Sequence, residues 1–267
     1  MANAGRVQWD AVGYRYYEAG VKNVVLYVWD SANNKYGAGV AWNGITAVNE
    51  SPSGAESNQL WANNAKYANL ISAEDFAATI EAYTYPDEFM ACDGFAALED
   101  GVYVSQQTRK SFCFTYRTEI GNDTDELNAG YKIHLVYGAL AAPSSRDRST
   151  LNDSPEALTM SWEISTTPVP VEGYKPTAHV IIDSTVINDA AKMANLENYL
   201  YGTAAVAAVE EDLTHDIAAV AGVDATIPTI AMPDEIADIL AGTKTGPTED
   251  EAEAEVETQT PAQTQNP

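Results

Sequence analysis

The sequence predicts a mainly β protein with flanking helices (α+β), built as an antiparallel β-sandwich or barrel and followed by an acidic helical C-terminal extension. Apolar residues alternate with period two in most of the first 187 residues, and turn signals such as Asn43-Gly44 separate the alternating runs. After residue 188 the apolar spacing becomes helical. These observations divide the chain into a β domain at 1–187, a helical acidic extension at 188–242 and a disordered acidic tail at 243–267.

The alternation is clearest in the middle of the chain, where Phe112, Phe114 and Tyr116 stand on one side of a predicted strand. We interpret such runs as half-buried antiparallel strands, because successive side chains of a strand point to opposite faces. The other predicted strands span residues 24–29, 40–48, 76–83, 102–106, 131–137, 160–164 and 178–186. Eight or so short strands with turns between them are typical of a sandwich or barrel.

Longer non-strand stretches are also predicted. Residues 57–71 are expected to form a loop or a short helix, and residues 144–155 an extended polar loop. Helices are expected at 189–201, where Gly202 follows as a C-cap, at about 204–220 and at 234–240. From residue 247 onward the chain carries six acids and no base, a composition typical of disorder.

Charge excludes one class of function. The chain of 267 residues has 14 Lys and Arg against 39 Asp and Glu, a formal net charge of −25. A conventional nucleic-acid binder needs bases to neutralise phosphates, so this class is excluded, and anionic membrane surfaces are disfavoured for the same reason. Residues 1–10 contain no apolar leader and no apolar run is long enough to span a bilayer, so we expect a protein made in the cytoplasm.

No motif for catalysis or metal binding is found. Cys92 and Cys113 form no CxxC pair, and the three histidines, His134, His179 and His215, lack the spacing of a metal site or triad. The acidic run 123–126 (DTDE) lacks the oxygen ligand and the glycine that a calcium loop needs next, so we interpret Asp123 and Asp125 as part of a polar hairpin loop. We therefore expect no cofactor and no enzymatic activity.

An ordered series of short motifs indicates a family, which the composition alone does not. The series reads WNGIT (42–46), ESPSG (50–54), NAKY (64–67), EAYTYPDEF (81–89), QTRKSF (107–112), TYRT (115–118), GNDT (121–124), GYKIHLVYG (130–138), PVPV (168–171), NLENYLYG (195–202) and PDE (233–235). Together these motifs resemble the major tail proteins, or tail tube proteins, of long-tailed, non-contractile bacteriophages that infect Gram-positive bacteria. The resemblance covers about residues 10–201, and the acidic stretch 203–226 departs from it.

The resemblance implies a tail-tube-like fold and a structural role in the virion. Subunits of this family assemble into stacked rings, usually hexameric, around a hollow tube through which the genome passes. The expected partners are further copies of the chain, a tape measure protein in the lumen, tail terminator and baseplate proteins at the tube ends, and genomic DNA that passes without specific binding. The expected location is the virion tail, assembled in the bacterial cytoplasm.

Six bases lie between residues 109 and 148, in the middle of an otherwise acidic chain. We hypothesise that the basic side chains of this segment face acidic surfaces of neighbouring subunits, with solvent-facing charges as the equal alternative. The candidates are Arg109, Lys110, Arg117, Arg146 and Arg148. Residues 50–70 and 144–155 are the candidates for contacts between rings.

Two other classes of function stay open at this point. The runner-up is a β-sandwich virion decoration or carbohydrate-binding module, because 5 Trp and 15 Tyr could stack on sugars. A carboxylate-based hydrolase is the weakest candidate, since the abundant acids include no located catalytic pair.

Overall fold

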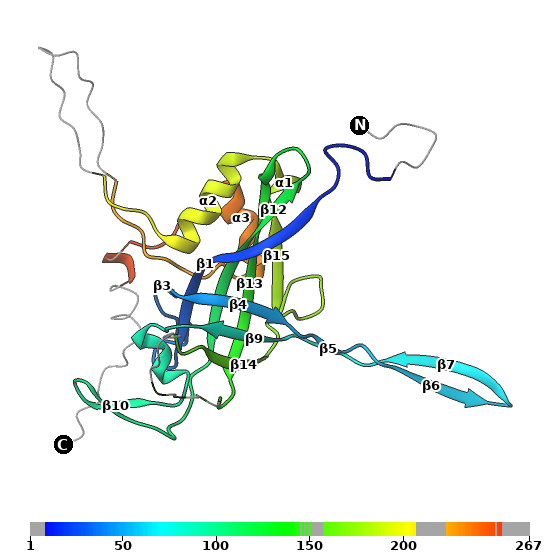
Figure 1. Cartoon of the computed structure of the whole chain (residues 1–267), viewed down its shortest axis with the longest axis horizontal. Coiled ribbons are helices and arrows are strands. Elements are labelled where there is room, and N and C mark those ends of the chain that lie inside the picture. The colour runs from blue at the N-terminus through cyan, green and yellow to red at the C-terminus, as the bar shows by residue number, and fades with distance from the viewer. Residues whose placement is uncertain are drawn as a thin grey trace, which may run out of the picture.

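The computed structural model describes residues 9–144, 146, 148, 150, 157–206, 223–248 and 250–252 (Figure 1). It is mainly antiparallel β-sheet with a few short helices, which confirms the predicted fold class. The strands are β1 Tyr17–Asp30, β2 Lys35–Tyr36, β3 Val40–Ala41, β4 Ile45–Glu50, β5 Ser53–Gly54, β6 Ser57–Ala62, β7 Ala65–Ile71, β8 Glu74–Asp75, β9 Ala77–Ala82, β10 Ala96–Glu99, β11 Val102–Val104, β12 Phe112–Asn122, β13 Glu126–Ala141, β14 Met160–Thr166 and β15 His179–Asp183. The helices are the 3-10 turns η1 Asp87–Ala91 and η2 Pro233–Glu235, and the α-helices α1 Ser184–Ile187, α2 Ala190–Tyr201 and α3 Ile236–Ala241.

The main sheet closes on itself. Its strands follow the order β2-β1-β12-β13-β14-β9-β4, and β3 pairs with β1. Only the turn at Trp42–Gly44 separates β3 from β4, and the Trp42 amide donates to the carbonyl of Val24 on β1 at 2.8 Å. The hydrogen-bonded ladders therefore return through β4 and β3 to β1, which makes a barrel of the sheet.

An aromatic cluster fills the barrel. Phe89 on η1 is fully buried, and its ring centroid lies 4.3 Å from Trp42, 5.1 Å from Trp162 and 5.4 Å from Phe112. The indole nitrogen of Trp42 donates to the Thr84 carbonyl at 3.0 Å, so this buried polar group is satisfied. The short η1 turn thus closes the interior with a large apolar side chain.

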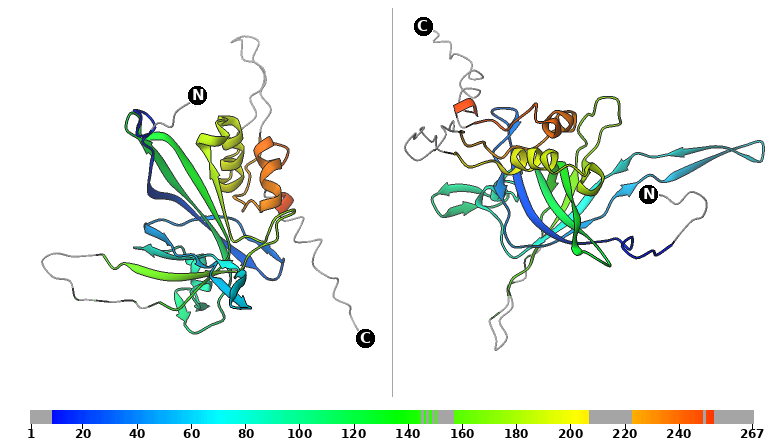
Figure 2. Two further views of the ribbon diagram at one scale, coloured as in Figure 1. Left: turned by 90° about the vertical axis from the view of Figure 1, so that its right-hand side faces the viewer. Right: turned by 90° about the horizontal axis from the view of Figure 1, so that it is seen from above.

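The outer face of the same strands is buried as well. Val24 and Leu26 of β1 point into the barrel, whereas Val25 and Tyr27 point out toward α2 and α3. Figure 2 shows both helices along one side of the sheet, and the Tyr27 hydroxyl donates to the carbonyl of Leu200 at 2.6 Å. The prediction of half-buried strands is wrong here: Phe112 to Tyr116 are buried on both faces, because the helices cover the side that was expected to meet water.

The helical predictions are confirmed at two of three places. Helix α2 begins after Asp189, whose carboxylate accepts from the amides of Ala191 and Lys192, and α3 follows η2 as expected. The third prediction, 204–220, falls mostly outside the described residues, but Val206 pairs with Val223 in an extended conformation, so its start is wrong. Helices α2 and α3 share one buried cluster with the sheet.

The structure tests one of the two loop predictions, at residues 57–71. Residues 57–71 form the hairpin β6–β7, not a loop or helix, because Asn63 and Asn64 take positive φ (52° and 61°) and reverse the chain in two residues. Most of 144–155 lies outside the described residues. So does most of the predicted disordered tail 243–267, although the Pro247 carbonyl accepts from the amide of Ile227.

The two cysteines lie on opposite faces of the sheet layer, Cys92 in the barrel interior and Cys113 under the helices. Both are free thiols, and burial raises the pKa of each to about 12. They therefore act as small core residues. Within the described residues, the helices are too short or too polar to cross a bilayer.

We predict that Leu196→Ala, which empties a fully buried position between α2 and the sheet, lowers the free energy of unfolding by about 3 kcal/mol. The control Val186→Ala removes a side chain that is 80% exposed and should cost less than about 0.5 kcal/mol. Urea unfolding followed by tryptophan fluorescence measures both. Equal effects of the two variants would show that α2 is not part of the cooperative core.

Candidate assembly surfaces

A long hairpin projects from the barrel, and we call residues 53–75 the hairpin arm. It leaves the barrel after β4 and returns at β9, and Figures 1 and 2 show it extending away from the other strands. At its neck β5 pairs with β8. Gly54 has φ 89° there, and a Cβ at this position would collide with the Ala73 carbonyl, so the neck requires glycine.

The two faces of the arm differ in polarity. Leu60 lies opposite Ala68, and Leu70 lies opposite Asn58 on the same face, because directly paired residues of an antiparallel ribbon share a side. This face consists of Asn58, Leu60, Ala62, Ala65, Ala68 and Leu70, and we call its five apolar residues the apolar stripe. The opposite face carries Ser57, Gln59, Trp61, Lys66, Asn69 and Ile71.

The arm leaves large apolar side chains in solvent. Leu60 is 41% exposed, Leu70 54%, Trp61 66% and Tyr67 78%. A two-stranded ribbon with no third strand or helix against it is marginally stable, and both of its edges offer unpaired backbone groups. The arm therefore leaves both large apolar side chains and two unpaired strand edges open to solvent.

Two of the predicted interface bases meet inside the chain. Asp93 is only 6% exposed, and Arg109 contacts it at 3.3 Å while also donating to the carbonyl of Ala141 at 3.0 Å. Arg146 makes a second ion pair with Asp93, and its guanidinium lies over the ring of Tyr85 at 5.3 Å. These two bases stabilise the link between η1 and the end of β13.

The remaining three candidates are placed differently from one another. Arg117 contacts Glu119 and Glu197, each at 3.4 Å, and lies over the Tyr131 ring at 3.5 Å, so it joins β12 to α2. Lys110 and Arg148 are exposed. Contact of these bases with neighbouring subunits stays a prediction, and Lys110 and Arg148 are the ones placed to make it.

The acidic turn between β12 and β13 is a hydrogen-bonded hairpin loop. The side-chain oxygen of Asn122 accepts from the amides of Thr124 and Asp125, and Asp123 accepts from the amide of Gly13 at 2.9 Å. These bonds confirm the interpretation of Asp123 and Asp125 as parts of a polar loop.

Strand pairing also brings together a side-chain cluster that no spacing in the sequence indicates. Pairing of β13 with β15 brings His134 Nδ1 to 3.1 Å from His179 Nε2, and Glu50 Oε1 lies 3.8 Å from the same Nδ1. Burial lowers the pKa of His134 and lowers that of His179 to about 4, so both rings are neutral at pH 7. Of the described residues, these three form the group that could hold a metal ion.

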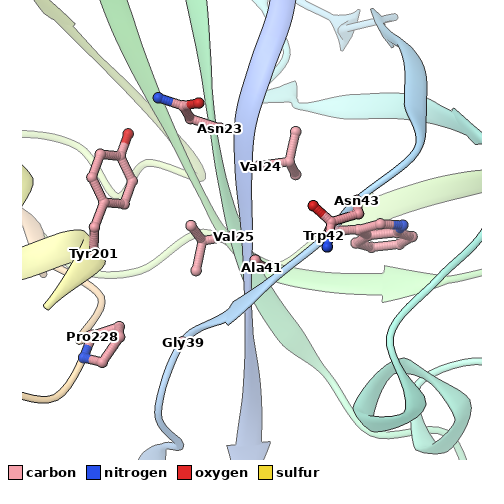
Figure 3. Close-up of a pocket in the computed structure, with 9 residues that line it drawn as sticks. All are labelled: Asn23, Val24, Val25, Gly39, Ala41, Trp42, Asn43, Tyr201 and Pro228. Carbon is pink, nitrogen blue, oxygen red and sulfur yellow. The ribbon is translucent and has the colours of Figure 1, made fainter.

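An open hollow lies between β1, β3 and the end of α2. Figure 3 shows Tyr201 and Pro228 on one side of it and Trp42 with Asn43 on the other. Its lining is mainly apolar with two asparagine amides, Asn23 and Asn43, and it contains no carboxylate, imidazole or thiol. This hollow therefore offers contact surface rather than acid–base chemistry.

No protein-family model and no curated protein matches the sequence. Among solved structures, the chain is similar to one from the cryo-EM structure of the anti-feeding prophage (AFP) baseplate, 6-fold symmetrised, with a TM-score of 0.32 and 10% identity over 66% of this chain and 97% of that chain. A similarity of that size defines neither the fold nor the function of this chain.

We predict that Asp93→Asn lowers the free energy of unfolding by about 3 kcal/mol, because two guanidinium groups lose their shared carboxylate in a largely buried place. Asp123→Asn removes an exposed ion pair with Arg15 and should cost less than about 1 kcal/mol. Thermal unfolding of both variants measures the difference. A loss at Asp93 no larger than that at Asp123 would contradict a structural role of the pair.

Proposed function

We propose that this protein is a structural virion protein, the major tail subunit that assembles into stacked, six-fold rings forming a hollow tail tube. The observation that carries the proposal is the hairpin arm, a ribbon with an apolar stripe that extends from a closed, well-packed barrel. The order of motifs in the sequence, which resembles tail tube proteins, supports the same role.

The arm supplies what ring stacking needs. The long central strands of the barrel bury both faces, and the arm carries Leu60, Tyr67 and Leu70 to a place where a second copy can cover them. Contacts that repeat from copy to copy in one direction generate filaments or tubes. The arm of one subunit thus lies against a subunit of the next ring.

The charge suits a DNA conduit. Duplex DNA carries one negative charge per about 1.7 Å, so a strongly acidic wall lets it pass without holding it. The same acidity makes the copies repel one another. Salt screens this repulsion between charges more than about 8 Å apart, so contacts between nearby charges determine whether the copies associate. Lys110 and Arg148, both exposed, are the proposed contacts with acidic surfaces of neighbouring copies.

The proposed partners follow from the same role. They are further copies of the chain, a tape measure protein in the lumen before ejection, and tail terminator and baseplate proteins at the ends of the tube. The genome passes through without specific binding, and the protein acts in the virion tail without catalysing a reaction.

The second candidate is a decoration or carbohydrate-binding module. Trp61 and Tyr67, at 66% and 78% exposure, are aromatic rings available for stacking on sugars. Binding of a glycan by protein that stays monomeric would favour this role over tube assembly.

We predict that Leu60→Asp with Leu70→Asp abolishes assembly, because two charges on the apolar stripe cannot be buried against a second copy. Folding should be unaffected, since both side chains lie outside the core and are 41% and 54% exposed. Sedimentation velocity measures assembly and thermal unfolding measures the fold.

The matched control is Ser57→Asp with Asn69→Asp, which places the same two charges diagonally on the opposite face of the ribbon. The control and the unmodified protein should both sediment as large assemblies. Assembly of the Leu60 and Leu70 variant at the level of the control would contradict the role of the apolar stripe.

A further inference from the structure

The interior of the barrel changes from apolar to polar along β12. Phe112, Phe114, Tyr116 and Thr118 alternate on its inner side, and neighbouring rings of the first three lie 6.0 Å apart. The Tyr116 ring then stacks on the imidazole of His134, with centroids 4.4 Å apart and planes at 6°. A row of core aromatic side chains therefore ends in a histidine at one end of the barrel.

Three strands bring three ligand atoms together at this end. In the β13–β15 ladder His134 pairs with Ile181 and Val136 with His179, so the two imidazoles are diagonal neighbours on one face. Glu50, the last residue of β4, approaches them from the other side. One carboxylate oxygen and two imidazole nitrogens all lie within 4.8 Å of one another.

Hydrogen bonding determines which nitrogen of His134 carries its proton. The Thr118 hydroxyl donates its single proton to the carboxylate of Glu18 at 2.5 Å, so it can only accept from His134 Nε2, which lies 3.1 Å away. His134 is thus protonated at Nε2, and the lone pair of Nδ1 faces His179 and Glu50.

The charges around the cluster leave room for a cation. Glu18 is neutralised by the Lys132 ammonium at 2.5 Å, whereas Glu50 faces two neutral imidazoles and accepts a hydrogen bond from the Tyr116 hydroxyl at 2.5 Å. One carboxylate charge and the Nδ1 lone pair of His134 therefore face the same small volume, and His179 Nε2 adds a second lone pair once its proton moves to Nδ1 of the same ring.

We propose that Glu50, His134 and His179 form a binding site for a divalent transition-metal ion such as Zn²⁺. Two imidazoles and one carboxylate suit Zn²⁺ far better than Ca²⁺ or Mg²⁺, which prefer oxygen ligands. Ligands of a tetrahedral zinc ion lie about 3.4 Å apart, between the 3.1 Å and 3.8 Å that separate His134 Nδ1 from its two partners.

The surroundings of the three ligands match those of metal sites. Metal-bound histidines donate their other ring nitrogen to an oxygen, and Thr118 accepts that bond from His134. Metal-bound carboxylates are themselves hydrogen-bonded, as Glu50 is by Tyr116.

The site is open to solvent on one side. The His179 ring lines a hollow that also includes Phe76, Pro168 and Tyr174, and the side chain of Glu50 is 38% exposed. An ion can enter there, and the fourth coordination position is left to water. Because Glu50 ends β4, three residues before the hairpin arm begins, a bound ion ties the base of the arm to β13 and β15. This inference does not depend on the proposed role in a tail tube.

The test is Zn²⁺ titration of the full-length protein after treatment with EDTA, followed by calorimetry and thermal unfolding. We expect one ion per chain and a rise in Tm of about 5 to 10 °C at a hundredfold excess over the dissociation constant. Substitution of Co²⁺ should give the intense visible absorption of a tetrahedral site with nitrogen ligands.

Three variants locate the ion. Glu50→Gln and His179→Gln each remove a ligand and should weaken binding about 100-fold or more, whereas Thr118→Val, which removes the acceptor for His134, should weaken it about 10-fold to 100-fold. The control Glu99→Gln neutralises an exposed acid at the end of β10 and should bind as the unmodified protein does. Tm values measured in EDTA check that each variant folds. If His179→Gln does not fold, Glu50→Gln still tests the site, because the Glu50 side chain is 38% exposed.

Two results would overturn the proposal. The first is the absence of saturable binding of one ion per chain. The second is equal Zn²⁺ affinity of Glu50→Gln and Glu99→Gln, which would place any bound ion elsewhere and leave the histidines as a hydrogen-bonded pair.

Discussion

The structure depends on the burial of both faces of its long central strands. Along β1, Val24 and Leu26 fill the barrel while Val25 and Tyr27 pack under the helices, and β12 and β13 follow the same rule. Full burial of one such side chain is worth about 1.5 to 3 kcal/mol, so each strand contributes twice what a half-buried one would. This constraint requires a filler inside, which η1 supplies with Phe89, and a cover outside, which α2 and α3 supply.

The same constraint explains why the hairpin arm stands apart. The buried apolar side chains of the barrel form two clusters, and no described side chain of the arm belongs to either. An acidic body with an exposed apolar extension can associate through that extension while its net charge of −25 opposes non-specific contact between copies. This is the combination of properties that a subunit of a long tube needs.

The sequence predicts local patterns well and long-range register poorly. Alternation from Phe112 to Tyr116 and the cap at Asp189 were readable because each depends on neighbours along the chain. Burial of β12 on both faces cannot be predicted from its local sequence, because it depends on helices that follow about 75 residues later. The Asn63-Asn64 turn signal was present and was missed, since the apolar residues around it do not alternate cleanly with polar ones. The partners of Arg109 and Arg146 at Asp93, and the meeting of His134 with His179, arise only from strand register, which no local pattern encodes.

Electron microscopy of the purified, unmodified protein tests the central claim most directly. The account predicts hollow tubes of stacked rings, or single rings that join into tubes as the protein concentration rises. Dispersed monomers at every concentration and ionic strength would contradict it.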